Sequence, residues 1–241
     1  MKQENKTYDV TTKAFFIAMV FLFILLQVAF HPTYLQYFPQ FHGFSWIHHT
    51  HGAIMVSWLI MLVIQPYLIY KGKHKTHRLI GKISYLIAPL MLISMFLATR
   101  LNYLTTVGKI PFKDVAYIQA LNFITPLIFL LFYSLAIYHK KEVFKHKRYM
   151  IGTSFILITA VLSRLLQLIF GSSIEPYDFF IPLYLGVIIS ALLLVNDILK
   201  DVNPIPYTII TVVLFLNIII FHARYTEVWQ SVVRFIGDRL F

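Results

Sequence analysis

The sequence HGAIMVSWLIMLVIQPYLIY, residues 51–70, contains no Asp, Glu, Lys or Arg and is followed at once by the basic run KGKHK, residues 71–75. An α-helix rises about 1.5 Å per residue, so about 20 apolar residues are needed to cross a hydrocarbon core about 30 Å thick. Residues 51–70 therefore have the length and composition of a transmembrane helix that ends at a polar surface.

Six further apolar blocks repeat this pattern and predict an all-α, polytopic membrane helix bundle of about seven transmembrane helices. The composition agrees, because 59% of the residues are hydrophobic and only 13% are charged, too few for the surface of a soluble domain. The first block has no small-residue cleavage site after it and is interpreted as a retained helix. We expect one integral-membrane domain over residues 1–241, with spans near residues 14–30, 51–70, 79–98, 115–138, 149–170, 179–199 and 205–221.

The basic residues are distributed unevenly between the two ends of these spans. With the N-terminus inside, 14 of the 21 Lys and Arg residues fall in cytoplasmic segments and 6 in outer segments, while Arg164 lies within a span. Short basic loops are retained in the cytoplasm, so the asymmetry predicts the N-terminus inside and the C-terminus outside. The net charge of +11 lies in these short loops, where it suits anionic lipid headgroups and argues against nucleic acid as a partner.

Motifs of nucleophilic or hydrolytic catalysis are absent from the sequence. It contains no G-x-S-x-G, no phosphate-binding glycine loop and no H-E-x-x-H, so whether the protein is an enzyme stays open. It contains no cysteine, so a metal site would have to use His, Met, carboxylate or main-chain oxygen. Asp197 is the only acidic residue expected inside a span, and Glu175 and Asp178 are expected to form a solvated pair on an outer loop.

Histidines at the outer end of the second span are the candidate metal ligands. His48, His51, Met55, Trp58 and Gln65 are spaced so that they follow one stripe of a helix. His51 is the principal candidate ligand for a metal or a haem, with His48 or His222 as the second ligand. The alternative is that these histidines occupy the headgroup region, which His, Trp and Tyr favour, without binding anything.

Polar residues in other spans are expected at the same depth as His51. Polar side chains in hydrocarbon turn to the bundle interior, where they find partners, so these residues predict a pocket open to the outside. Arg164 could instead extend its guanidinium to the headgroups. Asn217 and Arg224 share a helix face in the last span. The candidate cofactor-binding residues are Trp58, Gln65, Arg100, Gln119, Asn122, Arg164 and Gln167.

A second polar group is expected at the inner ends of the spans. Asp197 lies near the cytoplasmic end of the sixth span, and two similar basic motifs bring Arg78 and Arg148 to the same depth. We favour a structural ion-pair network that holds three helices together. A proton site or a haem-propionate site is the functional alternative. The predicted inner network consists of His77, Arg78, His146, Arg148 and Asp197.

Three motifs resemble those of a widespread family of uncharacterised bacterial integral-membrane proteins. They are His51-Gly52 followed by Trp58 and Gln65, then His77-Arg78-Leu79-Ile80-Gly81, then His146-Lys147-Arg148-Tyr149-Met150, in which Tyr149 replaces an expected leucine. The resemblance implies the bacterial cytoplasmic (inner) membrane and no established activity. A looser similarity to membrane proteins that assist haem–copper oxidase assembly, and to b-type cytochromes, is one of fold alone.

Together these patterns predict a redox-associated membrane protein that binds haem b or copper at an outward-facing histidine site. It would serve electron transfer or respiratory oxidase assembly, with subunits of a respiratory complex as partners. The alternative is a binder or transporter of a small anionic or amphipathic molecule, which would use the same pocket without metal. A structural subunit of a larger complex is a third possibility.

Overall fold

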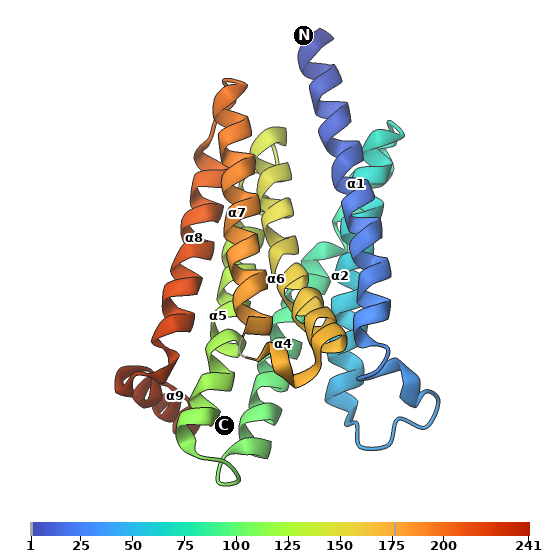
Figure 1. Ribbon diagram of the computed structural model, residues 1–241. Helices are drawn as coiled ribbons and strands as arrows, with labels where there is room; N and C mark the ends of the chain where they lie inside the picture. Colours follow the sequence, from blue (N-terminus) through green and yellow to red (C-terminus); the bar gives the residue numbers. More distant parts are fainter. Residues whose placement is uncertain (1, 176) are drawn as a thin grey trace. The chain divides into compact units, whose positions relative to one another are not determined.

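The computed structural model describes residues 2–175 and 177–241, and all regular secondary structure in these residues is helical (Figure 1). Seven helical segments are long and apolar enough to cross a membrane. The predicted multi-pass membrane helix bundle is therefore confirmed. The helices are α1 Lys2–Phe30, α2 Trp46–Tyr70, α3 His74–Gly81, α4 Ser84–Thr106, α5 Phe112–Tyr138, α6 Val143–Phe170, α7 Tyr177–Leu199, α8 Ile205–His222 and α9 Glu227–Leu240, with the 3-10 turns η1 Leu35–Tyr37, η2 Gly171–Ile174 and η3 Ala223–Tyr225.

The third span differs most from its prediction. The helix is interrupted at residues 82–83, between α3 and α4, and α4 continues to Thr106 although the span was expected to end at residue 98. The polar residues that suggested a loop are satisfied inside the helix, because the hydroxyls of Thr99, Thr105 and Thr106 each donate to the carbonyl oxygen four residues earlier, at 2.8 Å. Gly108, with a φ of 77°, provides the left-handed residue after the helix end.

The chain forms two compact units. Unit 1 comprises Met1–Met91 and Ala160–Asp178, and unit 2 comprises Leu92–Thr159 and Phe179–Phe241, so α4, α6 and α7 contribute to both. The predicted site residues are divided between the two units, and each unit is described by itself.

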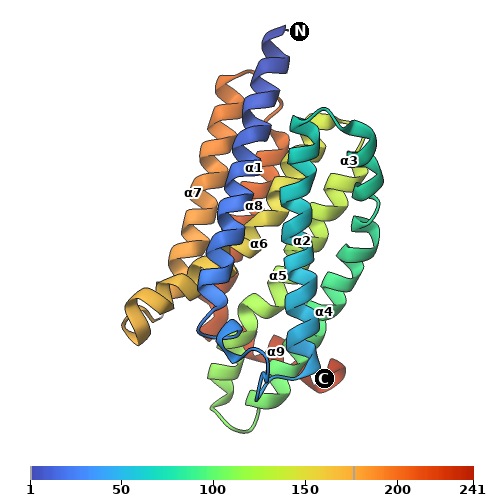
Figure 2. The same ribbon diagram turned by 90° about the vertical axis from the view of Figure 1, so that its right-hand side faces the viewer.

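In unit 1, α1 lies alongside α2 (Figure 1, Figure 2). The rings of Phe16 and Tyr67 pack at 5.5 Å. Trp58 of α2 is fully buried, and α1 buries Met19, Leu22, Leu26 and Ala29, whose spacing is that of one helix face. Most other apolar side chains of residues 11–30 and of α2 are at least partly exposed, as they must be where lipid is the solvent.

In unit 2, α5 packs against α8, η3 and α9. One apolar cluster buries Ala120 of α5 with Leu183 of α7 and both Ile218 and Phe221 of α8. A second cluster buries Tyr103 of α4 with Val115, Ala116 and Val233, and this cluster attaches α9 to the ends of α4 and α5.

Candidate functional site

The aromatic loop before α2 fixes His49. The Tyr34 hydroxyl and His49 Nδ1 are 2.5 Å apart, and the Phe41 ring meets the imidazole edge-on with its centroid at 5.0 Å. Phe44 packs against Tyr34 at 5.2 Å in the same cluster. His49 therefore belongs to the packing of this loop, on a different side of α2 from His51.

His48 caps α2. The backbone N–H of Ser45, the N-cap residue, donates to His48 Nδ1 at 3.1 Å, and the Ser45 hydroxyl lies 3.0 Å from the same nitrogen. A ring nitrogen that accepts a hydrogen bond holds no proton, so neutral His48 holds its proton on Nε2. In this arrangement His48 has no free lone pair to offer a metal.

The candidate site is centred on the guanidinium of Arg164 on α6, and His51 of α2 belongs to the same unit. His51 lies within electrostatic range of Arg164 and of His48. Arg164 Cζ lies 4.3 Å from the centre of the Phe30 ring, at the end of α1. Three elements of unit 1 thus bring a cation, an imidazole and an aromatic ring together in the half of the membrane spans that was predicted to be outer.

Arg164 pairs with no carboxylate among the residues that the structure describes. Its contact with Phe30 uses the face of the guanidinium and leaves the five N–H donors in the plane of the group available to a ligand. A planar fork of N–H donors is the arrangement that binds carboxylate or phosphate through two parallel hydrogen bonds.

Asp178 corrects the expectation of a solvated acidic pair at Glu175 and Asp178. Its side chain is only 1% exposed, in the first turn of α7. Gln167 Nε2 donates to Asp178 Oδ2 at 2.5 Å, and the Ser163 hydroxyl donates to it at 3.5 Å. The positive end of the α7 dipole also favours a carboxylate here. Gln167 is therefore committed to Asp178, one turn from Arg164 on α6.

Trp58 and Gln65 belong to the predicted helix stripe that includes His51, and they lie further along α2 than His51. With its amide oriented to pair donors with acceptors, Gln65 donates to the His77 carbonyl at 3.2 Å and accepts from the Gly81 N–H at 3.1 Å. Gln65 thus ties α2 to α3, while Trp58 is fully buried. Arg78 lies exposed in the last turn of α3.

In unit 2, the predicted polar residues are used within the helices. Gln119, which is fully buried, donates to Asn102 Oδ1 at 2.7 Å and accepts from Asn122 Nδ2 at 3.2 Å. Arg100 donates to the main-chain oxygen of Phe241 at 3.3 Å. Asn102 was missed because the sequence placed it in a loop beyond the third span.

His222, the candidate second ligand, also belongs to unit 2. Its Nε2 lies 2.9 Å from the Tyr184 hydroxyl, and its ring packs against Phe180 at 4.9 Å. No group of three or more His, Asp or Glu side chains that could hold a metal ion is found among the described residues. Ligation by His48, His51 and His222 stays a prediction.

Arg224, which was expected to share a helix face with Asn217, is a buried cation. It is 1% exposed, and its Cζ lies 3.9–4.7 Å from the centres of four aromatic rings. Nη1 donates to the Phe221 carbonyl, and Nε has no hydrogen-bond partner in the described part of the chain. The rings belong to Tyr117, Phe180, Phe221 and Tyr225.

At the other end of unit 2, Arg148 and Asp197 form a two-pronged ion pair. Arg148 Nε donates to Asp197 Oδ2 at 2.5 Å and Nη2 donates to Oδ1 at 2.8 Å, with side chains only 10% and 4% exposed. Arg148 also donates to the Phe144 carbonyl at 3.1 Å. His146 is engaged separately, with Nδ1 lying 2.8 Å from the Ala136 carbonyl.

No protein-family model, curated protein or solved structure matches this chain. The resemblance to bacterial integral-membrane proteins therefore stays a prediction from the motifs around His51, His77 and His146.

Proposed function

We propose that the protein binds an anionic amphipathic molecule, as a binder or transporter, with the anionic group on Arg164 beside His51. The observation that supports this proposal is the contrast between two arginines in the same span, α6. Arg148 is neutralised by a bidentate carboxylate, whereas Arg164 contacts an aromatic ring and no carboxylate among the described residues.

The energetic argument follows from the position of Arg164 within a span. An arginine at the centre of a membrane helix costs on the order of 2.5–3.5 kcal/mol on insertion scales. An anionic ligand that pairs with the guanidinium offsets this cost, and a bidentate pair is the strongest form of such a contact. A protein that keeps an unneutralised arginine here has a site prepared for an anion.

The charges near His51 favour an anion over a metal ion. A cation bound at His51 would lie close to the positive guanidinium of Arg164, and His48 already uses Nδ1 to cap α2. An anion instead gains from both groups, and it gains more when His51 is protonated. The haem and copper hypotheses, and a role in electron transfer or respiratory oxidase assembly, stay predictions.

The surroundings of Arg164 favour an amphipathic ligand. Phe30 lies against the guanidinium, so an apolar ring contacts the cation directly. A long-chain carboxylate would place its charge on Arg164 while its hydrocarbon tail stays in the apolar phase. A small hydrophilic anion would lose its hydration without this compensation.

Oleate and oleyl alcohol, which share a chain and differ in charge, provide the test in purified protein. Arg164→Gln should weaken oleate binding by about 10- to 100-fold, the loss expected for hydrogen bonds to a charged group, and leave oleyl alcohol unaffected. Arg164→Lys should retain part of the affinity, because it keeps the charge without the planar fork. The matched control is Arg234→Gln, because Arg234 also lies over an aromatic ring, that of Phe112, but is not a candidate binding residue; this change should leave oleate binding unaffected.

The pH dependence separates the anion from the metal. An anion that keeps its charge, such as an alkyl sulfonate, should bind more tightly once His51 is protonated, whereas metal ligation needs neutral imidazole and weakens as pH falls. An oleate affinity unchanged in Arg164→Gln would refute the proposal. A Soret band in the purified protein that disappears in His51→Ala would support haem in its place.

A further inference from the structure

A second apolar surface lies on α9, in unit 2. The helix attaches to the bundle by one side, where Val233 is buried, Trp229 Nε1 donates to the Ala116 carbonyl at 2.8 Å, and Gly237 lies against the Tyr103 ring. Adjacent to this buried side is a row of apolar side chains that unit 2 leaves uncovered. Val228, Val232 and Phe235 are 75%, 40% and 59% exposed.

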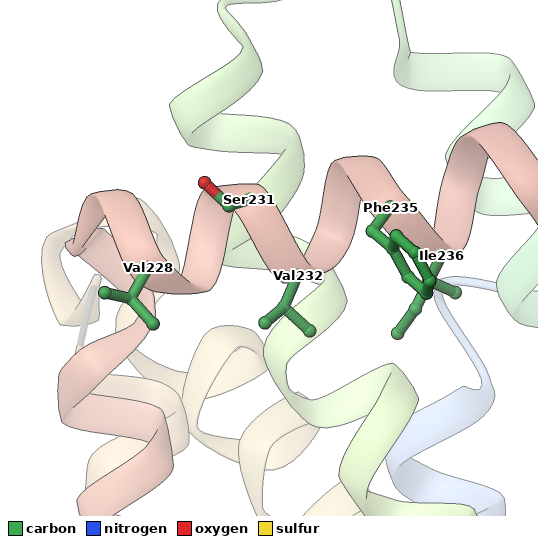
Figure 3. Close-up of a pocket in the computed structure, with 5 residues that line it drawn as sticks. All are labelled: Val228, Ser231, Val232, Phe235 and Ile236. Carbon is green, nitrogen blue, oxygen red and sulfur yellow. The ribbon is translucent and has the colours of Figure 1, made fainter.

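These side chains line an open groove of about 670 Å³, together with Ser231 and Ile236. Figure 3 shows the side chains of Val228 and Val232 along one side of α9, while the Ser231 hydroxyl points away from them. Residues that follow one another by three and four positions form a continuous stripe on a helix, and the polar residues Arg234 and Asp238 fall on the other side. The helix is therefore amphipathic.

The position of α9 in the chain places it at the membrane boundary. The last candidate membrane span is Ile205–Tyr225, and α9 begins two residues later. Thr226 caps the start of α9, because its side chain accepts a hydrogen bond from the Trp229 N–H. Its 14 residues extend about 21 Å at 1.5 Å per residue, too short to cross the hydrocarbon core. Figure 1 shows α9 running across the end of α8 instead of continuing it.

A cation lies at the edge of the groove. Arg239 Cζ lies 4.4 Å from the centre of the Phe235 ring, and Arg239 makes no ion pair within the described part of the chain. Amphipathic helices that lie in the interface bury their apolar side about 5–10 Å into the headgroup and acyl boundary, with basic residues near the phosphates.

We propose that α9 is an interfacial helix whose groove holds an acyl chain of a membrane phospholipid, with the lipid phosphate on Arg239. Unit 2 also exposes apolar side chains on α8, which precedes α9 across the turn η3, and these include Val212, Phe215 and Ile219. Acyl chain and phosphate match the apolar stripe and the arginine, so one phospholipid accounts for both features.

The absence of native cysteine makes a site-specific test direct. Val232→Cys and Asp238→Cys, which lie on the apolar and polar sides of α9, are each labelled with bimane in the full protein reconstituted in nanodiscs. The Val232 probe should be quenched several-fold more by nitroxide on the lipid acyl chain than by aqueous iodide. The Asp238 probe is the matched control and should show the reverse order.

Two other outcomes overturn the proposal. Equal iodide quenching at both positions would place the groove in water, and protection of Val232 from both quenchers would mean that protein, such as a second copy of the chain, covers it. The role of Arg239 is tested by native mass spectrometry with phosphatidylglycerol. Arg239→Gln should lose one bound lipid relative to Lys109→Gln, and equal lipid counts would remove the phosphate contact from the proposal.

Discussion

Breaking the ion pair between Arg148 and Asp197 should be among the most destabilising changes in unit 2. Asp197→Asn removes one charge and leaves the guanidinium of Arg148 with the Phe144 carbonyl at 3.1 Å and two flanking rings at 5.4 and 5.5 Å. Both side chains of the pair are at most 10% exposed, so water cannot replace the carboxylate. We expect a loss of about 3–5 kcal/mol in the free energy of unfolding, the usual cost of an unpaired buried charge.

A double-mutant cycle measures the pair itself. Arg148→Met should also destabilise, and the double variant should lose far less than the sum of the single variants, because no unpaired charge remains. The assay is reversible unfolding by steric trapping in bicelles. Breaking the exposed pair of Lys145 and Glu142, at 2.6 Å, by Lys145→Met is the matched control and should have little effect. Additive losses at Arg148 and Asp197 would show that the two residues do not stabilise each other.

Two further predictions concern the attachment of α9 and the loop between α5 and α6. Gly237→Ala should lower the melting temperature of the purified protein, because a Cβ atom at this position would collide with the Tyr103 ring. An overpacked contact of this kind costs about 1–3 kcal/mol. An unchanged melting temperature would contradict close packing of Gly237 against Tyr103. Hydrogen bonds from Lys145 and His139 hold the pKa of the Glu142 carboxyl below its usual range, so its small contribution to stability is present at neutral pH and fades as pH falls through that lowered pKa. Lys145→Met should raise the Glu142 pKa, which carbon-13 NMR of labelled glutamate would follow, and an unmoved titration would contradict the assignment.

The fold could be predicted from the sequence because a membrane imposes a simple requirement on it. Every helix that crosses the hydrocarbon must be long and apolar, so blocks such as residues 51–70 can be recognised as transmembrane helices from the sequence. The end of α4 could not be predicted in the same way. Thr99 and Thr106 read as loop residues, and only the hydrogen bonds from their hydroxyls to the helix backbone show how the helix tolerates them.

The candidate site could be predicted only in part, since chemistry indicated which residues need partners but not which partners they find. An acid in a span must be neutralised, so Asp197 pointed to an arginine, yet the choice of Arg148 depends on tertiary packing. The burial of Asp178 depends on the hydrogen bond that it accepts from Gln167 of the preceding helix. We expected Asp178 to be solvated, which was wrong. To predict that His48 caps α2, the exact first residue of the helix would have to be known, and sequence patterns locate helix ends poorly.

Arg224 has a mechanical consequence for the end of the chain. Its guanidinium contacts rings from α5, α7, α8 and η3 at once, so the turn between α8 and α9 is held by one side chain shared among four elements. The C-terminal helix cannot rock about that turn without displacing Tyr117 of α5 and Phe180 of α7. Movement of α9 about this turn therefore acts on three spans through side-chain contacts, in addition to the main chain.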